Sequence, residues 1–227
     1  MNKKELVDFE KNIIKEFKKG ETYGPVHLSG GNEDALIKIF KKVKPQDWIF
    51  STHRSHYHAL LKSQDKKWLT DEIIKNANSS HINSRTHKIF TSAIVGGIIP
   101  IALGVAMGIK RKWEIPCLDK DGKVDVEPNH KAHVWCFVGD MASEMGCFHE
   151  AIKYANGNKL PITFIIEDNA IGCNSPTKKV WGGRTWGWPS NVIHYTYVRY
   201  YPHYGIGEWV IFKKKKFKSQ GDYNAYK

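Results

Sequence analysis

The sequence predicts an α/β fold, in which a mainly parallel sheet carries helices on both faces. Two continuous apolar runs, HVWCFV at residues 133–138 and PITFIIE at 161–167, read as strands that are buried on both sides. The segment between them, 142–156, has the apolar spacing of a helix. Strand, helix and strand together form a βαβ unit, the building block of parallel sheets, and this unit indicates the fold class.

The segments before this unit fit the same architecture. Residues 1–19 place Leu6, Phe9 and Ile13 on one face of a predicted amphipathic helix. After a loop, the pattern predicts a helix at 33–42, a short strand at 47–51, a segment at 52–62 that begins polar and turns helical, and a short helix at 68–75.

Residues 92–111 read as a loop that enters a buried helix. Pro100 falls in the first turn of that helix, where its missing N–H costs little because that group would have no helical partner. Residues 117–131 are polar and contain DKDG, which predicts a hairpin insertion with a plain turn rather than a calcium loop. The Tyr- and Val-rich stretch 192–212 is expected to add edge strands to the sheet.

The length and charge of the chain indicate its domain organisation and the kind of partner it favours. Its 227 residues suit one domain, which we expect to span 1–212, followed by a basic tail at 213–227. With 35 Lys and Arg against 23 Asp and Glu, the net charge is +12, which favours anionic partners without naming one. Nucleic-acid binding is disfavoured, because a lysine run is typical of a solvated terminus and no RNA-binding motif is present.

The cysteines and the apolar segments predict a cytoplasmic protein that does not enter the membrane. No two of the four cysteines form a CxxC pair, which disfavours a zinc site, and the chain is not a small disulfide scaffold. The first residues have an amphipathic pattern rather than that of a signal peptide. The longest apolar stretch, 96–109, contains Pro100 and is too short to span a bilayer.

Two predicted strand ends carry residues that point to chemistry. The first strand of the βαβ unit ends in Gly139 and Asp140, and the second runs into Asn169. Ligands bind at the carboxyl ends of strands in open α/β sheets, so Asp140 and Asn169 can approach each other there. Their oxygens suit Mg²⁺, and the N–H groups of Met141 and Ala142 suit a phosphate. An N-cap Asp and a turn Asn are also ordinary without a ligand, so the pattern alone leaves both interpretations open.

Four segments carry a longer pattern. They are HLSGGNEDA at 27–35, THRSHYHALLK at 52–62, SSHINSRTHKIFTSAIVGGIIPIALGVAMGIK at 79–110, and GDMASEMGCFHEAIKYANGNKLPITFIIEDNAIG at 139–172. In the same order they resemble HLxxGQEA, YRDHxxxLxxG, SMHM…GIVGxxxPxAxGxAxAxK and GDGAxxxGxxxEAxNxAxxxxLPxxFxxxNNxYG of the alpha subunits of the 2-oxo acid dehydrogenase family (pyruvate, branched-chain and acetoin dehydrogenases). The resemblance implies the thiamine-diphosphate-binding fold.

The resemblance also implies roles for single residues. The Mg²⁺ ligands would be Asp140, the side chain of Asn169 and the carbonyl of Ile171. Arg54 would contact the diphosphate of thiamine diphosphate, and because arginine binds phosphate through a charged fork, lysine would not replace it silently. Further cofactor contacts would come from His53, Ala93, Val95, Gly139, Met141 and Ala142, and the histidines that line the approach to the reactive carbon would be His27, His56 and His81.

The sequence also departs from the family pattern. Met141 replaces the second Gly of the GDG motif, and Asp168 replaces the first Asn of the NN motif, as in transketolase. Residues 176–212 do not match the family region that bears a further diphosphate-binding His. Neither His194 nor His203 can be assigned to that role.

The resemblance implies a component of an enzyme that decarboxylates a small 2-oxo acid. In the family, a beta-type subunit supplies the Glu that activates the cofactor, so we expect this chain to act in a heterotetramer with such a partner. Two alternatives stay open: half of a split transketolase-like enzyme, which Asp168 and the SEMG at 143–146 favour, and a non-catalytic subunit of such an assembly.

Overall fold

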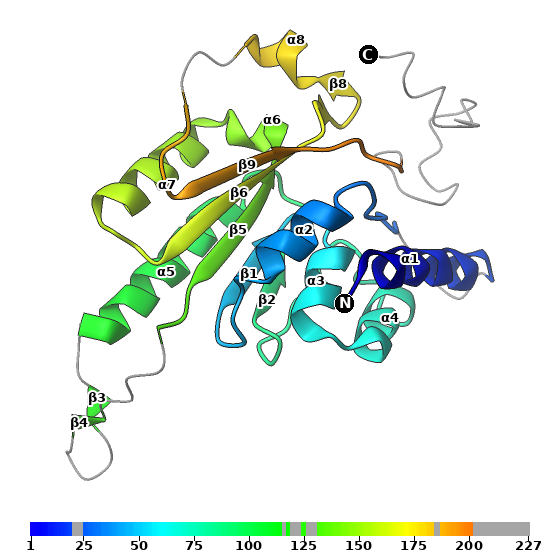
Figure 1. Ribbon diagram of the computed structural model, residues 1–227, viewed down its shortest axis with the longest axis horizontal. Coiled ribbons are helices and arrows are strands. Elements are labelled where there is room, and N and C mark those ends of the chain that lie inside the picture. Colours follow the sequence, from blue (N-terminus) through cyan, green and yellow to red (C-terminus); the bar gives the residue numbers. More distant parts are fainter. Residues whose placement is uncertain (20–24, 115–116, 119–123, 126–130, 184–186, 202–227) are drawn as a thin grey trace.

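The centre of the molecule is a parallel sheet. The computed structural model describes residues 1–19, 25–114, 117–118, 124–125, 131–183 and 187–201. Within these residues the main sheet has five strands, in the order β2-β1-β5-β6-β9, and all of its pairings are parallel (Figure 1). The predicted α/β fold is therefore confirmed. The strands are β1 (Trp48–Ser51), β2 (Ile89–Thr91), β5 (Val134–Gly139), β6 (Ile162–Asp168) and β9 (Val192–Thr196).

Helices cover both faces of this sheet because its central strands are apolar on both sides. In β5, Trp135 and Phe137 belong to one buried cluster, whereas Val134, Cys136 and Val138 belong to the other. The first cluster packs under α1 (Lys3–Lys18), α2 (Glu33–Phe40), α3 (His56–Ser63) and α4 (Lys66–Ile74), and the second under α5 (Ile98–Glu114) and α7 (Gly146–Gly157).

The connections reverse direction between two central strands. Strand β1 pairs with β2 on one side and with β5 on the other. The chain runs from β1 through α3 and α4 to β2, and then returns through α5 to β5 on the opposite side of β1. Adjacent connections that leave in opposite directions open a crevice at the carboxyl ends of the strands, where α/β proteins bind ligands. The topology therefore places a binding crevice at the ends of β1 and β5.

One predicted helix is divided in two. The expected helix at 142–156 is observed as α6 (Asp140–Ser143), a single turn, followed by α7. Met145, between them, has an extended backbone (φ −72°, ψ 144°), and its side chain packs against Gly96, where an added Cβ would lie 2.9 Å from the sulfur. This contact between distant segments interrupts the helix, and a local sequence pattern does not show it.

Several short elements differ from expectation or were not predicted. The expected hairpin at 117–131 is present as the antiparallel strands β3 (Cys117–Leu118) and β4 (Val124–Asp125), but its DKDG turn lies outside the described residues. The strand β2 and three elements between β6 and β9 were not predicted, because each is short and lies outside a continuous apolar run. Those later elements are β7 (Ile171–Gly172), β8 (Ser175–Pro176) and α8 (Thr177–Trp181).

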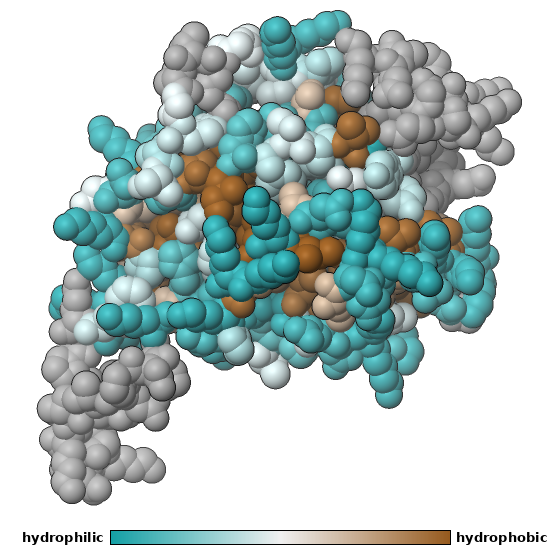
Figure 2. Space-filling model, in the orientation of Figure 1, coloured by the Kyte–Doolittle hydropathy of each residue, from teal (hydrophilic) through white to brown (hydrophobic). Residues whose placement is uncertain are grey.

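Among the described residues, none of the helices has both the length and the apolar character needed to cross a membrane. The face shown in Figure 2 is mostly hydrophilic, with smaller apolar areas between the polar side chains.

The expected edge strand is present as β9. The rest of the 192–212 stretch beyond residue 201 and the predicted tail at 213–227 lie outside the described residues.

Candidate active site

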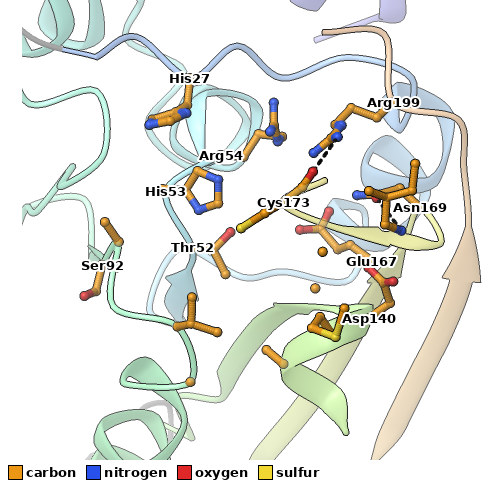
Figure 3. A pocket seen from close by; sticks show the side chains of 18 of the residues that line it. His27, Thr52, His53, Arg54, Ser92, Asp140, Glu167, Asn169, Cys173 and Arg199 are labelled. Carbon is orange, nitrogen blue, oxygen red and sulfur yellow. Dashed lines mark hydrogen bonds between the residues drawn. The ribbon is translucent and has the colours of Figure 1, made fainter. Parts of the chain in front are cut away.

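A cavity of about 350 Å³ lies at the carboxyl ends of β1, β2, β5 and β6 (Figure 3). It therefore occupies the crevice that the strand order creates. Its lining residues are His27, Thr52, His53, Arg54, Ser92, Ala93, Ile94, Val95, Gly96, Gly139, Asp140, Met141, Ala142, Glu167, Asn169, Ile171, Gly172, Cys173, Tyr197 and Arg199.

The four motif segments converge on this one cavity. Loop residue His27 belongs to the first segment, and residues 52–54 after β1 belong to the second. Residues 92–96 after β2 belong to the third, and the remaining lining residues up to Gly172 belong to the fourth. Among the described residues that line the cavity, only Cys173, Tyr197 and Arg199 come from outside these segments. Segments more than a hundred residues apart in sequence thus form a single site.

The predicted oxygen ligands lie together on one side of the cavity (Figure 3). Asp140 begins α6, is 5% exposed, and accepts a hydrogen bond from the hydroxyl of Thr177. Burial raises the pKa of Asp140, although the bond from Thr177 acts in the opposite direction. The Oδ1 atom of Asn169 accepts a bond from the N–H of Ile171 at 3.2 Å, and its Nδ2 donates to Tyr197 Oη at 3.1 Å. The carbonyl-bearing side of the Asn169 amide is thereby oriented.

Arg54 and two histidines occupy another side of the cavity (Figure 3). Arg54 follows β1, is buried, and donates from Nη1 to the carbonyl oxygen of Leu28 at 2.8 Å. Burial lowers the pKa of Arg54, but a guanidinium still stays protonated at neutral pH. The rings of His27 and His53 meet edge to face, with centroids 4.7 Å apart. A charged, forked donor therefore lies beside two imidazoles.

The remaining predicted cofactor contacts also line the cavity. Ala93 and Val95 lie in the loop after β2, and Val95 is 61% exposed. Gly139, Met141 and Ala142 lie at the end of β5 and in α6. Since α6 is only one turn long, its dipole is smaller than that of the longer helix that the sequence predicts.

Met141 fills space that the family motif gives to glycine. A Cβ atom added to Gly172 would lie 2.6 Å from the Cβ of Met141, so the two segments are in close contact only because Gly172 has no side chain. The indole N–H of Trp181 approaches the sulfur of Met141 at 3.0 Å. The bulky residue is thus accommodated by the glycine of β7 and held by α8.

Two of the three predicted histidines are not among the cavity-lining residues. His56 is fully buried: its Nδ1 lies 3.1 Å from Glu10 Oε1, and its Nε2 lies 2.9 Å from Ser79 Oγ. His81 is exposed, and its main-chain N–H donates to Asn78. Their positions differ from that of His27 because the motifs fix the chain path but not which side chains reach the crevice.

Asp168, His194 and His203 were left without a firm role. Asp168 accepts from the N–H of Ala170 at 2.8 Å, and its Oδ2 lies 2.9 Å from Nε2 of His194. Neither residue lines the cavity, so this pair lies beside the site. His203 lies outside the described residues.

The sequence reasoning missed Glu167 as a cavity residue. Glu167 is 6% exposed and accepts bonds from Asn32 Nδ2 at 3.0 Å and from the hydroxyl of Tyr195, while His58 Nε2 lies 3.3 Å away. Burial by itself would raise the pKa of Glu167. The charge and hydrogen bonds of these neighbours, His58 foremost, outweigh it and hold that pKa below its ordinary value. A carboxylate at the end of an otherwise apolar strand was the available signal.

Comparisons with known proteins agree with the motif pattern. A family model described as "Dehydrogenase E1 component" matches residues 1–183. The chain is 30% identical over 175 residues to the pyruvate dehydrogenase E1 component subunit alpha-3 of Oryza sativa subsp. japonica, covering 72% of this chain and 40% of that protein. It is 30% identical over 181 residues to the alpha subunit of acetoin:2,6-dichlorophenolindophenol oxidoreductase of Bacillus subtilis, covering 76% and 50%.

Two further comparisons complete these findings. The pyruvate dehydrogenase E1 component subunit alpha of Porphyra purpurea is 31% identical over 176 residues, covering 73% of this chain and 48% of that protein. A solved structure of a proposed thiamin diphosphate-dependent enzyme from Mycobacterium smegmatis aligns with a TM-score of 0.38 and 21% identity, over 63% of this chain and 22% of that one. The chain spans half or less of the length of these curated relatives.

Proposed function

Because the chain belongs to the dehydrogenase E1 component family, we propose that it is the alpha-type component of an enzyme that decarboxylates a 2-oxo acid. The enzyme would use thiamine diphosphate and Mg²⁺ and would require a beta-type partner. The observation that carries the proposal is the convergence of four separate motif segments on one cavity at the switch point of the sheet.

The oxygen side of the cavity fits Mg²⁺. This ion prefers oxygen ligands in octahedral geometry, usually with one or two carboxylates together with phosphates and waters. Asp140 would supply the carboxylate, Asn169 the amide oxygen, and Ile171 a main-chain carbonyl. Burial raises the pKa of Asp140, and a bound cation would offset that cost of desolvation.

The opposite side of the cavity fits the diphosphate and the substrate. Arg54 would hold phosphate oxygens through a charge-assisted fork. His27 and His53 would orient the substrate carboxylate and exchange a proton at a ring nitrogen, because imidazole changes charge near neutral pH. When bound, thiamine diphosphate supplies the electron sink that makes decarboxylation of a 2-oxo acid possible.

A beta-type partner is proposed because the cavity has an exposed apolar rim. Ile94 and Val95 line the cavity and are 71% and 61% exposed, respectively. Apolar side chains at the mouth of a site for a polar cofactor are suited to burial against a second subunit. The partner would supply the activating Glu, and the assembly would be a heterotetramer.

Calorimetry on the full chain tests the cofactor site. Titration with thiamine diphosphate should give binding that requires Mg²⁺ in the wild type, and Asp140→Ala should weaken it by at least about tenfold, since a ligand to the metal is lost. Asp168→Asn is the matched control, because it changes the neighbouring carboxylate that does not line the cavity, and it should bind within about twofold of the wild type.

Activity tests the reaction class. With a co-expressed beta-type subunit, the complex should reduce an artificial electron acceptor in the presence of a 2-oxo acid such as pyruvate. Equal affinities of Asp140→Ala and Asp168→Asn for thiamine diphosphate would contradict the proposal. Turnover of xylulose phosphate without turnover of any 2-oxo acid would also contradict it. The second result would favour the split transketolase alternative.

A further inference from the structure

The segment that follows β9 crosses over the glycine pair of the first motif. The N–H of Tyr200 approaches the carbonyl oxygen of Gly30 at 3.4 Å. Gly31 has φ +96°, and a Cβ atom added there would lie 1.9 Å from the carbonyl oxygen of Val198. Only glycine allows this approach, because any side chain at Gly31 would strain the backbone and collide with the crossing segment. Gly31 therefore permits the observed path of residues 197–201.

This path brings Arg199 into the cavity. Arg199 is 6% exposed and lines the cavity, and its Nη2 donates to the carbonyl oxygen of Cys173 at 3.3 Å. A guanidinium carries five N–H donors in a planar fork, which suits it to bind an anion with several oxygens. In Figure 3 the guanidinium groups of Arg199 and Arg54 lie on the same side of the cavity. Two buried arginines, from opposite ends of the chain, thus line one cavity.

Two buried guanidinium groups that line one cavity repel each other. Burial, and after it the charge of Arg54, lower the pKa of Arg199 to about 10. Arg199 still carries a positive charge at neutral pH. The charge of Asp140 acts in the opposite direction and raises the pKa of Arg199. An anion with several negative oxygens would offset the repulsion between the two guanidinium groups.

The same segment also reaches the oxygen side of the cavity. Tyr197 lines the cavity, and its hydroxyl oxygen accepts a bond from Nδ2 of Asn169 at 3.1 Å. Two residues further on, Arg199 is bonded to the loop at Cys173. Residues 197–199 therefore connect the proposed metal ligand with the arginine side of the cavity, and they would respond to one ligand that spans both.

We propose that Arg199 is a second diphosphate-binding residue, which clamps the cofactor together with Arg54. The inference rests on the proposed function and deepens it. It assigns a binding role to a residue beyond position 183, where the match to the family ends. The segment at 197–201 would act as a strap, positioned by Gly31, that supplies this charge.

Binding of thiamine derivatives to the full chain tests the inference. Thiamine, thiamine monophosphate and thiamine diphosphate, each with Mg²⁺, differ only in the phosphates that the clamp would hold. Arg199→Gln should weaken thiamine diphosphate by about 10- to 100-fold, the usual range for a charge-assisted hydrogen bond, and leave thiamine within about twofold. The affinity of Arg199→Lys for thiamine diphosphate should lie between those of the wild type and Arg199→Gln, since lysine keeps the charge but loses the forked donor. The exposed Arg85, changed to Gln, is the matched control and should bind all three as the wild type does.

A second variant tests the inference in case Arg199→Gln does not fold. Gly31→Ala should displace the strap and give the same selective loss of thiamine diphosphate, with a melting transition retained. Wild-type affinity for thiamine diphosphate in Arg199→Gln, together with a clear loss in Arg54→Gln, would overturn the inference and leave the proposed function standing. If the wild type binds thiamine diphosphate no better than thiamine and Asp140→Ala changes nothing, the proposed function itself fails, and the clamp fails with it.

Discussion

Removal of the His56 side chain should destabilise the chain more than any change to an exposed histidine. His56 joins three segments that are far apart in sequence: Glu10 from α1, Ser79 from the loop before β2, and its own helix α3. All three side chains belong to residues with no exposed surface. The N–H groups of Ser29 and His27 also donate to this network, to Glu10 at 2.7 Å and to Ser79 at 3.0 Å.

The magnitude follows from what His56→Ala leaves behind. The Glu10 carboxylate would keep the N–H of Ser29 as a donor and would lose its contact with the His56 ring. Removing one member of such a buried pair costs about 3–5 kcal/mol. For a chain of this size, 1 kcal/mol shifts the melting temperature by about 2–4 °C, so the melting temperature should fall by about 6–20 °C.

Urea unfolding followed by tryptophan fluorescence measures this effect. The matched control is His81→Ala: that side chain is exposed, so its removal should change the free energy of unfolding by less than about 0.5 kcal/mol. The double variant Glu10→Leu/His56→Leu removes both polar groups and should be less destabilised than His56→Ala, because no buried charge is left unpaired. A loss below about 1 kcal/mol for His56→Ala, or a double variant worse than the single one, would refute the reasoning.

Three further predictions test other parts of the structure. Burial lowers the pKa of Lys62 to about 8, so between about pH 8 and 10 the unfolded chain binds more protons than the folded chain. The free energy of unfolding should therefore increase as the pH rises through this range. Urea midpoints measured across the range should show this increase in the wild type but not in Lys62→Met. Gly172→Ala should lower the free energy of unfolding by about 1–3 kcal/mol in thermal melts, because the new Cβ would lie 2.6 Å from that of Met141. Adding Met141→Gly to the same chain should restore the stability, and a double variant that stays destabilised would contradict this contact. Cys173 is exposed and lines the cavity, so thiamine diphosphate with Mg²⁺ should slow its alkylation, as measured by peptide mapping. An unchanged rate would contradict a cofactor at that position. The variant Cys173→Ser identifies which peptide signal belongs to this residue.

The sequence pattern predicted the central elements because burial on both faces leaves a continuous apolar signal. Strands β5 and β6 were found in this way, and their residues alternate between the two buried clusters. The same reasoning missed β2, a three-residue strand within a polar stretch. It also joined α6 to α7, because the extended residue Met145 is held by packing against Gly96, a contact that no local pattern records.

The candidate site shows the same division. The motif segments predicted that Asp140, Asn169, Arg54 and His27 would come together, and the cavity contains all four. His56 matches its motif equally well, but its side chain turns toward Glu10 in a buried network.

The sequence by itself determined the fold class and the residues at the ends of the central strands, because hydrophobic alternation and strand-end position are local properties of the chain. Only the tertiary structure decided that Arg199 reaches the cavity, since its place depends on the crossing of residues 197–201 over Gly30 and Gly31. Such a contact between segments about 170 residues apart depends on packing, where the absence of one Cβ atom permits the approach, and no periodicity in the sequence encodes it.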